Sequence, residues 1–466
     1  MKAFLLISGG NLFRQLVTFI GQLYIVKKLG VSSFGELTFA FSIYMVMAGI
    51  GDFGTRIYSW KQVLATKTEL RSKITSRLWC ERTIFVSLFS LLFVLCILIF
   101  IRGHLKYLLL LYAICVVMNQ ATFDWVFLSL EKIVHVFFFN SASGLIYLFL
   151  LFSMVQSKND IFGVPVAFFL SYLIPAVFLF GEDLWSFLKK TSPVKFKELV
   201  HSSMRIPLKS HQFMYYELFQ RLYLIAVFLV AWHFYSKKII GEFRISQLLF
   251  VLVSTLSVYL GVSFFNKVHE ESITQSSGLK VVHGVVAILL IVIPISITGI
   301  FLVIPVIKIY FGENFQLKPL QILFWGLLLP VLSNFIRETV VAAGFSRASI
   351  LSYISSIAVV VFSIFFYHPN SIVFLALTLL LGEGIGLIVL LSLIPFPVFS
   401  RIRLNSLWVP GVFGFVLLFF LKKDFFITDF FRIGSLQLWL NISVYLLVYG
   451  VYAYFIRKEK IEKWIK

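Results

Sequence analysis

Apolar segments of about twenty residues recur along the whole chain, and short polar stretches separate them. A helix of that length crosses the hydrocarbon core of a bilayer. Backbone in lipid must also satisfy its own hydrogen bonds, which a helix does. The pattern therefore predicts an all-α polytopic membrane protein of about fourteen transmembrane helices.

The predicted spans form two groups of six and a trailing pair. They indicate a six-helix lobe over residues 1–182, a basic cytoplasmic linker over 183–210 and a second six-helix lobe over 211–396. Residues 397–466 hold the final helix pair and a basic cytoplasmic tail. The spans of the first group are Ala3–Val26, Leu37–Ile57, Thr83–Ile101, Tyr107–Leu130, Val134–Val155 and Ile161–Gly181. Those that follow are His211–Trp232, Ile245–Asn266, His283–Ile307, Lys318–Val341, Ala348–Tyr367 and Ser371–Ile394, then Leu404–Leu421 and Ser435–Ile456.

The composition agrees with a chain that the bilayer solvates. Hydrophobic residues make up 60% of it and charged residues 13%, with a mean hydropathy of +0.95. A net charge of +20 raises the question of nucleic acid, but the basic residues lie in loops, as membrane topology requires. Three isolated cysteines and eight scattered histidines lack metal-ligand spacing. We therefore expect no nucleic-acid partner, no metal and no cofactor.

Lysine and arginine in the loops set the orientation. With the N-terminus inside, about 24 of the 41 basic residues fall on the cytoplasmic side and about 13 outside, which places both termini in the cytoplasm. The first segment has no small-residue cleavage site and contains Arg14, so we expect a retained helix and not a signal peptide. The long basic loops Tyr58–Arg82 and Glu182–Ser210 suit contact with anionic membrane lipids.

A short internal repeat relates the two groups of spans. Leu12–Leu16 resembles Leu218–Leu222, and Gly35–Leu37 resembles Gly241–Phe243, at one constant offset of about 206 residues. Both matches fall at equivalent places in a six-helix unit. Transporters often build two lobes around a central path from such repeats.

Polar residues inside the predicted spans give the best indication of mechanism. A charge in the bilayer costs roughly 2.5–3.5 kcal/mol on insertion scales, so the charges that remain usually face a cavity. Arginine is well suited to phosphate, because its planar fork stays charged and donates parallel hydrogen bonds. The polar groups are Asn11, Arg14, Gln15, Thr18 and Gln22 in the first span, Glu217, Gln220 and Arg221 in the seventh, and Asn334, Arg337 and Glu338 in the tenth.

An internal ion pair is the alternative role for these arginines. Glu217 and Arg221 lie four residues apart on one helix face, and Asp52 and Arg56 have the same spacing. The cavity role is favoured for Arg221, whereas the two roles are balanced for Arg337.

Acidic residues at or within the spans are the candidates for ion coupling. One of them, Glu383, lies in the glycine-rich stretch Gly382–Gly386, which favours close helix packing over a nucleotide loop because no strand precedes it. The candidates are Asp52, Asp124, Glu217 and Glu383.

Several short motifs, in order along the chain, resemble bacterial polysaccharide flippases. Each motif is brief, and the order and spacing across the spans give the resemblance its weight. The first half contributes Gly10–Asn11, Lys28–Gly30, Ser33–Gly35 and Gly51–Gly54, and the second half Ile240–Phe243, Tyr310–Phe315 and Ala342–Arg347.

This resemblance implies the O-antigen flippase branch of the multidrug/oligosaccharidyl-lipid/polysaccharide (MOP) exporter superfamily. It implies alternating access in the bacterial inner membrane, with undecaprenyl-diphosphate-linked oligosaccharide as the cargo and the polymerase and chain-length proteins of the same pathway as partners. The family's cationic lumen would correspond here to Arg14 and Arg221, with Arg337 as a third member and Asn11, Gln15 and Gln220 beside them. The arginines are offset by one position between the repeats, so they need not face the lumen at the same angle.

Two other functions stay open from the sequence. A membrane glycosyltransferase or O-antigen polymerase would normally have a large extramembrane loop, whereas the predicted periplasmic loops are short. A multidrug exporter of the same superfamily would handle cations, and its cavity should be rich in carboxylates instead of arginines.

Overall fold

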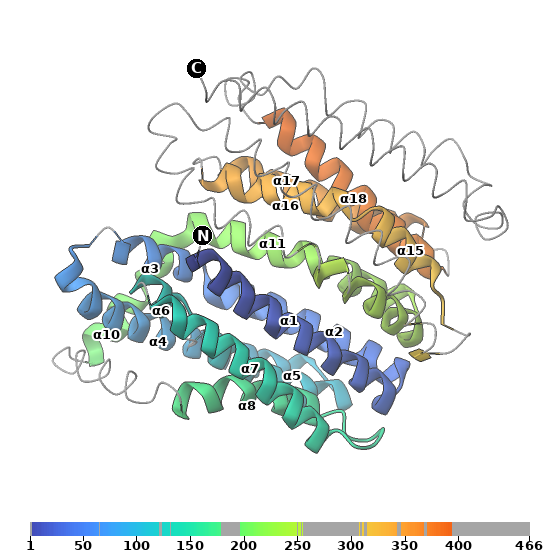
Figure 1. Cartoon of the computed structure of the whole chain (residues 1–466), viewed down its shortest axis with the longest axis horizontal. Helices are drawn as coiled ribbons and strands as arrows, with labels where there is room; N and C mark the ends of the chain where they lie inside the picture. Colours follow the sequence, from blue (N-terminus) through green and yellow to red (C-terminus); the bar gives the residue numbers. More distant parts are fainter. Residues whose placement is uncertain are drawn as a thin grey trace, which may run out of the picture. The chain divides into compact units, whose positions relative to one another are not determined.

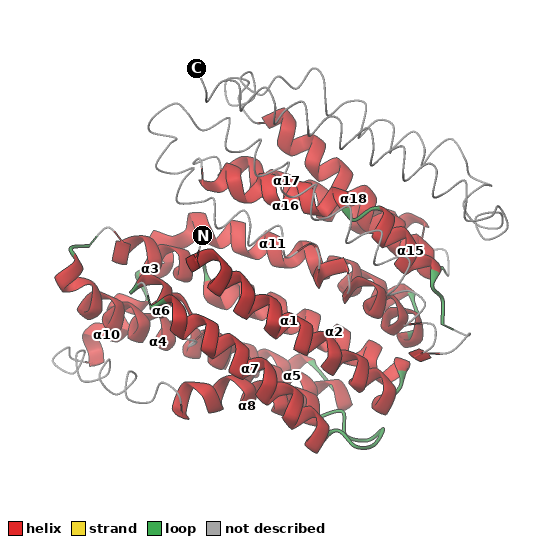
Figure 2. Ribbon diagram, in the orientation of Figure 1, coloured by secondary structure: helices red, strands yellow, loops and turns green. Residues whose placement is uncertain are grey.

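The computed structural model describes residues 2–178, 196–254 and 315–393, with Ile307, Tyr310 and Phe311, apart from gaps at 65, 121–123, 131, 249, 253, 343–345 and 368–370. This part of the chain is built from helices, and no strand occurs in it (Figures 1 and 2). Six of its helices are long and apolar enough to cross a membrane, and a bent pair makes a seventh span. A multi-pass, all-α membrane protein is thus confirmed.

The count of about fourteen spans stays a prediction. All the described residues belong to one compact unit, residues 1–398. The predicted spans Leu404–Leu421 and Ser435–Ile456, and His283–Ile307 apart from its last residue, lie outside the described residues. The predicted limits of the two lobes stay predictions as well.

The first group of helices forms a bundle in which α1 packs on α7, α7 on α8, and both α2 and α4 on α5 (Figure 1). The predicted spans for α1, α7 and α8 agree with the structure to within a few residues. The bounds are α1 (Lys2–Leu29), α2 (Val31–Asp52), α3 (Thr55–Leu64), α4 (Thr68–Phe100), α5 (His104–Gln120), α6 (Asp124–Ser129), α7 (Ile133–Met154) and α8 (Gly163–Phe178).

The second predicted span is wrong at its C-terminal end. Phe53 has a left-handed backbone with φ 49°, and the next residue, Gly54, has φ 69°. This conformation ends a helix, and glycine adopts it at little cost. The chain therefore turns after α2 and begins α3, where the sequence had suggested a continuous helix to Ile57.

The predicted start of the third span is also wrong. α4 begins at Thr68, inside the predicted loop Tyr58–Arg82, because its first turns are polar and carry no hydropathy signal. Within the predicted span Tyr107–Leu130 the structure contains α5 and α6, and residues 121–123 between them lie outside the described residues.

The second group begins with α10 (Phe196–Ser203), inside the predicted linker, and α11 (Ile206–Phe234). Residues 237–248 are helical, so the eighth span begins before the predicted Ile245. The predicted span Lys318–Val341 is bent by 47° between α15 (Lys318–Trp325) and α16 (Leu328–Ala342). α17 (Ser346–Tyr367) and α18 (Ile372–Leu393) agree with their predictions and pack on each other.

α2 and α11 pack antiparallel along their lengths and join the two groups of helices. At one end Phe39 stacks on Trp232 with ring centroids 4.2 Å apart. At the other end Gly54 lies so close to the backbone of Phe213 and Met214 that a Cβ would overlap it. α2 and α11 also carry several of the buried polar groups, among them Asp52, Glu217 and Arg221.

Candidate functional site

Arg14 of α1 points into the first bundle. Its Nη1 donates to the Tyr172 hydroxyl of α8 at 3.2 Å, and its guanidinium carbon lies 5.7 Å from the centre of that ring. Gly144 of α7 leaves room for it, because a Cβ there would lie 3.1 Å from the Arg14 Cα. Asn11 and Gln15 are half-buried on the same helix. Arg14 is thus held by the hydroxyl and the ring of one tyrosine.

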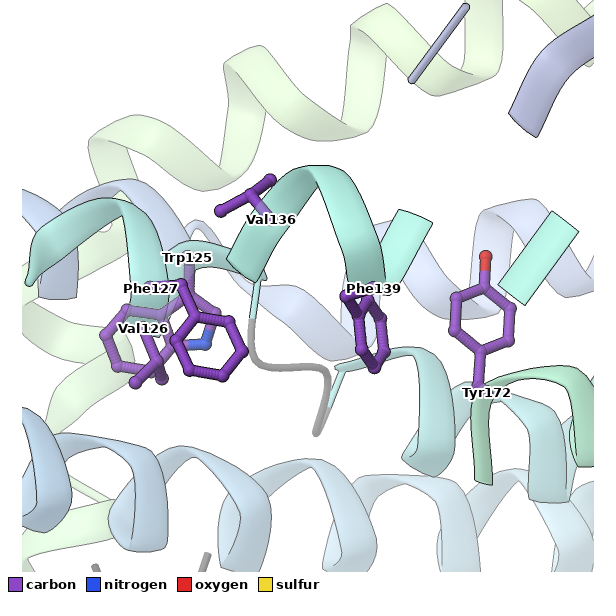
Figure 3. Close-up of a cluster of buried hydrophobic side chains, with 6 residues drawn as sticks. All are labelled: Trp125, Val126, Phe127, Val136, Phe139 and Tyr172. Atoms are coloured by element: carbon purple, nitrogen blue, oxygen red, sulfur yellow. The ribbon is translucent and has the colours of Figure 1, made fainter. Parts of the chain in front are cut away.

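Tyr172 belongs to a buried cluster that joins α6, α7 and α8. In Figure 3, the α6 side chains lie at one end and Tyr172 at the other, with Phe139 of α7 between them. Phe168 contacts the rings of Tyr172, Tyr147 and Tyr44, which extends the aromatic region towards α2. Arg14 contacts this aromatic region through Tyr172.

Asp52 forms a buried ion pair with Arg82 of α4. The Arg82 Nη2 lies 2.6 Å from Asp52 Oδ1, and the two side chains are 2% and 0% exposed. The Arg82 guanidinium also lies over the Trp125 ring at 5.6 Å. The suggested pairing of Asp52 with Arg56 is wrong, because the turn at Phe53 carries Arg56 onto a new helix.

Arg56 instead pairs with Glu217 of α11, at 3.1 Å between Nη2 and Oε1. Glu217 is 2% exposed, and its other oxygen lies 3.2 Å from Arg221 Nη2, as the spacing of four residues suggested. Gly49 of α2 permits this arrangement, since a Cβ there would lie 3.2 Å from Arg221 Cδ. Arg221 is therefore at the interface of the two groups, and its charge is shared with a carboxylate.

The Gln220 side chain points towards α16, whereas Glu217 and Arg221 point towards α2 and α3. Its Nε2 donates to Glu338 Oε1 at 3.0 Å, and the Tyr216 hydroxyl donates to the same oxygen at 2.6 Å. Glu338 is 7% exposed.

Arg337 lies in the interior of the second group. Its Nη1 is 3.2 Å from Glu383 Oε2, and both side chains are 0% exposed. It donates to the hydroxyls of Ser352 and Ser356, and its guanidinium stacks 4.2 Å from the Tyr353 ring centre. These partners engage all three guanidinium nitrogens of Arg337 and make it a cross-link between α16, α17 and α18.

Arg244 is a residue that the sequence did not single out. Its Nη1 donates to Gln247 Oε1 at 2.7 Å, and its guanidinium lies 5.8 Å from the Phe41 ring centre and 5.4 Å from that of Phe228. No carboxylate within the described residues lies at ion-pair distance from it. The predicted span began one residue later, at Ile245, so Arg244 counted as a loop residue. The repeat could have located it, because residues 237–248 correspond to the start of α2.

Asp124 begins α6, and its side chain lies outside the part of the chain that the structure describes. The structure places the other three acidic candidates at the C-terminal end of α2 (Asp52), within α11 (Glu217) and within α18 (Glu383). Each of these three is ion-paired with an arginine.

A family model described as polysaccharide biosynthesis protein matches residues 1–265. No curated protein matches the chain. Solved structures with a similar fold include the lipid II flippase MurJ in an inward closed conformation, at 14% identity and a TM-score of 0.65 over 98% of this chain and 100% of that one. A multidrug resistance MATE family transporter in an inward-facing conformation has 13% identity and a TM-score of 0.61, over 84% and 95% of the two chains. A transporter from Pyrococcus furiosus has 13% identity and a TM-score of 0.59, over 87% and 96%. All three are members of the MOP superfamily, and the likeness establishes the fold.

Proposed function

The chain belongs to the family of polysaccharide biosynthesis proteins, and we propose that it is a flippase that moves an oligosaccharide linked to undecaprenyl diphosphate. The cargo would be an O-antigen repeat unit, carried by alternating access from the cytoplasmic to the periplasmic leaflet of the bacterial inner membrane. Both termini would lie in the cytoplasm, and the polymerase and chain-length proteins of the pathway would receive the product. The protein itself would form and break no covalent bond.

The observation that carries this proposal is the environment of Arg244. A guanidinium between two aromatic rings, with an amide as its polar partner and no carboxylate near it among the described residues, has a charge that an anion can neutralise. Gln247 holds it in place, because the Gln247 Nε2 donates to the Leu224 carbonyl at 2.8 Å. A diphosphate is the charged part of the cargo, and arginine is its best partner.

Arg14 and Arg221 stay in the proposed binding set, with Asn11, Gln15 and Gln220 near them on the same helices. Arg14 is held by a tyrosine hydroxyl, and Arg221 is part of a cluster in which two arginines share Glu217. Arg337 leaves the set, because its full complement of buried partners would have to be broken to bind cargo.

The experiment that tests the proposal replaces Arg14, Arg221 and Arg244 singly with Ala and with Lys. Surface glycan is measured at equal protein level in a strain that lacks the chromosomal copy. We expect strong loss in the Ala variants and partial recovery with Lys, which keeps the charge but not the bidentate geometry. The exposed loop residue Arg102, changed to Ala, is the control.

Purified protein in nanodiscs gives a second readout that does not depend on the sugar. Binding of undecaprenyl diphosphate should weaken in R244A and stay unchanged in R102A. Normal glycan in all three Ala variants, together with unchanged binding, would overturn the proposal.

Multidrug export is the alternative within the same fold. It would need carboxylates available to a cationic drug, whereas Asp52, Glu217 and Glu383 are each committed to an arginine and Glu338 accepts hydrogen bonds from Tyr216 and Gln220. We therefore expect cells that produce the protein to expel ethidium no faster than cells that do not. Faster efflux would favour the exporter.

A further inference from the structure

A shallow apolar hollow lies at the N-terminal end of α5, where this helix approaches the start of α8. Its wall consists of Tyr107, Leu110 and Leu111 of α5 and of Phe162, the residue before α8. The lining atoms are apolar, and the hollow has a volume of about 400 Å³. It is therefore suited to a hydrocarbon chain and not to a polar ligand.

The face of α5 that forms the hollow is turned away from the first group of helices. Tyr107 is 60% exposed and Ile114, seven residues further on, is 51% exposed. Leu108 and Leu109, between them on the other faces, are buried. An exposed apolar face of a membrane-spanning helix meets lipid chains, so lipid is the natural occupant of the hollow.

Phe162 is held in place by a short series of contacts. Its ring lies 4.7 Å from the His104 ring, centre to centre. His104 Nδ1 in turn lies 3.3 Å from Glu36 Oε1 of α2. The wall that α5 does not supply is thus fixed before a ligand arrives, which lowers the entropic cost of binding.

Lys106 lies at the edge of the hollow, one residue before Tyr107 and four before Leu110. Side chains of a helix point towards its N-terminus, so Lys106 extends from the apolar wall towards the polar turn before α5. A lysine in this position covers apolar surface with its methylene groups and keeps its ammonium in the headgroup layer. It is half-buried, and no carboxylate of the described residues lies within ion-pair distance of it.

The positive charge at this end of the molecule has no topological reason. Lys106 in the first turn of α5 and Lys158 in the loop before α8 fall on the predicted outer side, where the positive-inside rule disfavours them. The carboxylate of Glu36 is engaged by Lys237, and that of Asp160 by backbone N–H groups of its own loop. The first turn of α5 contains no acidic residue. An anion from outside the chain would therefore be attracted to this end.

We propose that the hollow is a binding site for an anionic phospholipid of the membrane. One acyl chain lies against Leu110, Leu111 and Phe162, and the Lys106 ammonium binds the headgroup phosphate. Burial of the chain and the ion pair at the membrane interface act together. A zwitterionic lipid offers the same chain but carries its own compensating cation, and free phosphate offers no chain.

This site is separate from the one proposed for the cargo. Tyr112 lies on the opposite, buried face of α5, and its ring centre is 6.0 Å from that of Phe41. Phe41 is one of the two rings that hold Arg244. The hollow and Arg244 are thus on opposite sides of α5, and the inference does not depend on which cargo the protein moves.

Native mass spectrometry of the purified full chain in detergent, titrated with phosphatidylglycerol or with phosphatidylcholine, tests the proposal. We expect the wild type to retain phosphatidylglycerol several-fold better than phosphatidylcholine. K106A should lose most of this preference and K106R should keep it, since arginine also binds phosphate. L111W, which fills the hollow, and Y107A, which removes an exposed part of its wall, should both weaken the phosphatidylglycerol complex while Lys106 is present.

R102A is the matched control, because Arg102 is exposed in the same turn but lies outside α5. It should retain phosphatidylglycerol nearly as well as the wild type. The unfolding temperature of each variant without added lipid identifies one that fails to fold, and Y107A, at an exposed position, then replaces L111W. Unchanged preference in K106A would overturn the proposal. Equal losses in K106A and R102A would also overturn it, because they indicate diffuse attraction and not a site.

Undecaprenyl diphosphate, added as a competitor, identifies the source of the bound chain and phosphate. We expect it to leave phosphatidylglycerol in place on the wild type and on R244A. Displacement from both would assign the hollow to the cargo and overturn the phospholipid as its occupant. None of these results changes the glycan measurements on the arginine variants, so a failure here and a failure of the flippase are distinguishable.

Discussion

Gly35 of α2 and Gly241 of the 237–248 helix contact each other's helices in a reciprocal manner. A Cβ on Gly35 would overlap the carbonyl oxygen of Lys237, and a Cβ on Gly241 would overlap that of Val31. Val31 and Lys237 are related by the same offset of about 206 residues as the two glycines. A two-fold relation between two copies of a unit produces such matched contacts.

Adding a methyl group at either glycine should therefore separate the two helices. G35A and G241A should each lower the thermal unfolding temperature in detergent and reduce surface glycan, because a backbone carbonyl cannot move aside as a side chain can. Their effects should be less than additive, since both changes open one contact.

Gly384 provides the matched control within this chain. It lies in α18, and a Cβ there would meet nothing within 4 Å. G384A should be neutral or stabilising by up to about 1 kcal/mol, because alanine favours a helix over glycine. If G384A and G35A lower the unfolding temperature and surface glycan equally, the close contact between α2 and the 237–248 helix is not the cause.

Asp160, in the loop between α7 and α8, gives a pH prediction. The backbone N–H of Ser157, then its hydroxyl and the N–H of Gln156, donate to the carboxylate and hold the pKa of Asp160 below its ordinary value. The folded pKa is the lower one, so the stabilisation is present above the usual aspartate pKa of about 3.9 and is lost as pH falls through the folded value.

D160A should accordingly speed proteolytic cleavage in this loop at neutral pH. The difference from the wild type should shrink in strong acid, where the wild-type carboxylate is protonated too. D160N keeps one acceptor oxygen and should be intermediate. A difference that stays constant with pH would contradict this role for the carboxylate.

The helices that the sequence predicts well are those in which the apolar run and the helix end together. α7 and α17 are such cases, because polar loop residues follow directly. The turn at Phe53 and the bend at Gly326 were missed, since they interrupt apolar sequence that remains suited to a helix. Local backbone conformation decides these breaks, and hydropathy does not encode it.

The spacing of four residues predicted one ion pair within a helix correctly and one wrongly, whereas pairs between helices were not predicted. The wrong pair, Asp52 with Arg56, is separated by the turn at Phe53. The spacing of Glu217 and Arg221 indicated their contact, which the structure contains. Nothing in the sequence pairs Asp52 with Arg82 or Arg337 with Glu383, because these contacts depend on how separate helices pack. Arg244 was missed for a simpler reason, an error of a few residues at a helix end.

Glu36 and Lys237 form an ion pair near the N-terminal end of α2, where α2 packs against the 237–248 helix. Their charged atoms lie 2.7 Å apart, and the His104 ring is 3.3 Å from the other oxygen of Glu36. Because Lys237 is about half exposed, the pair should contribute only about 0.2–1 kcal/mol to stability. E36Q and K237Q should each change the unfolding temperature little.

A double-mutant cycle of E36Q and K237Q should give a coupling energy of about 0.2–1 kcal/mol that falls with salt. The same variants should alter the rate of glycan export more than they alter stability, since a weak pair at a moving contact affects opening before it affects folding. No coupling, or a coupling that salt leaves unchanged, would contradict a direct ion pair.

Variants of the buried ion pair between Arg337 and Glu383 distinguish a structural role of these charges from a role in binding cargo. Removing one partner, as in R337M or E383Q, leaves the other charge buried and should cost about 3–5 kcal/mol. Both single variants should therefore lose folded protein and glycan together. The double variant R337M/E383M removes both charges and fills the space with apolar groups, so it should recover much of the stability.

Glycan made by that double variant is the informative measurement. Recovery of glycan together with stability would mean that Arg337 acts only as a cross-link between α16, α17 and α18, as its 0% exposure indicates. A stable double variant that makes no glycan would indicate that Arg337 takes part in binding cargo. R244A should lose glycan with a smaller loss of unfolding temperature than R337M, because it leaves no carboxylate of the described residues unpaired. Measurements of unfolding temperature and surface glycan on the Arg337 and Arg244 variants would then distinguish a role in folding from a role in transport.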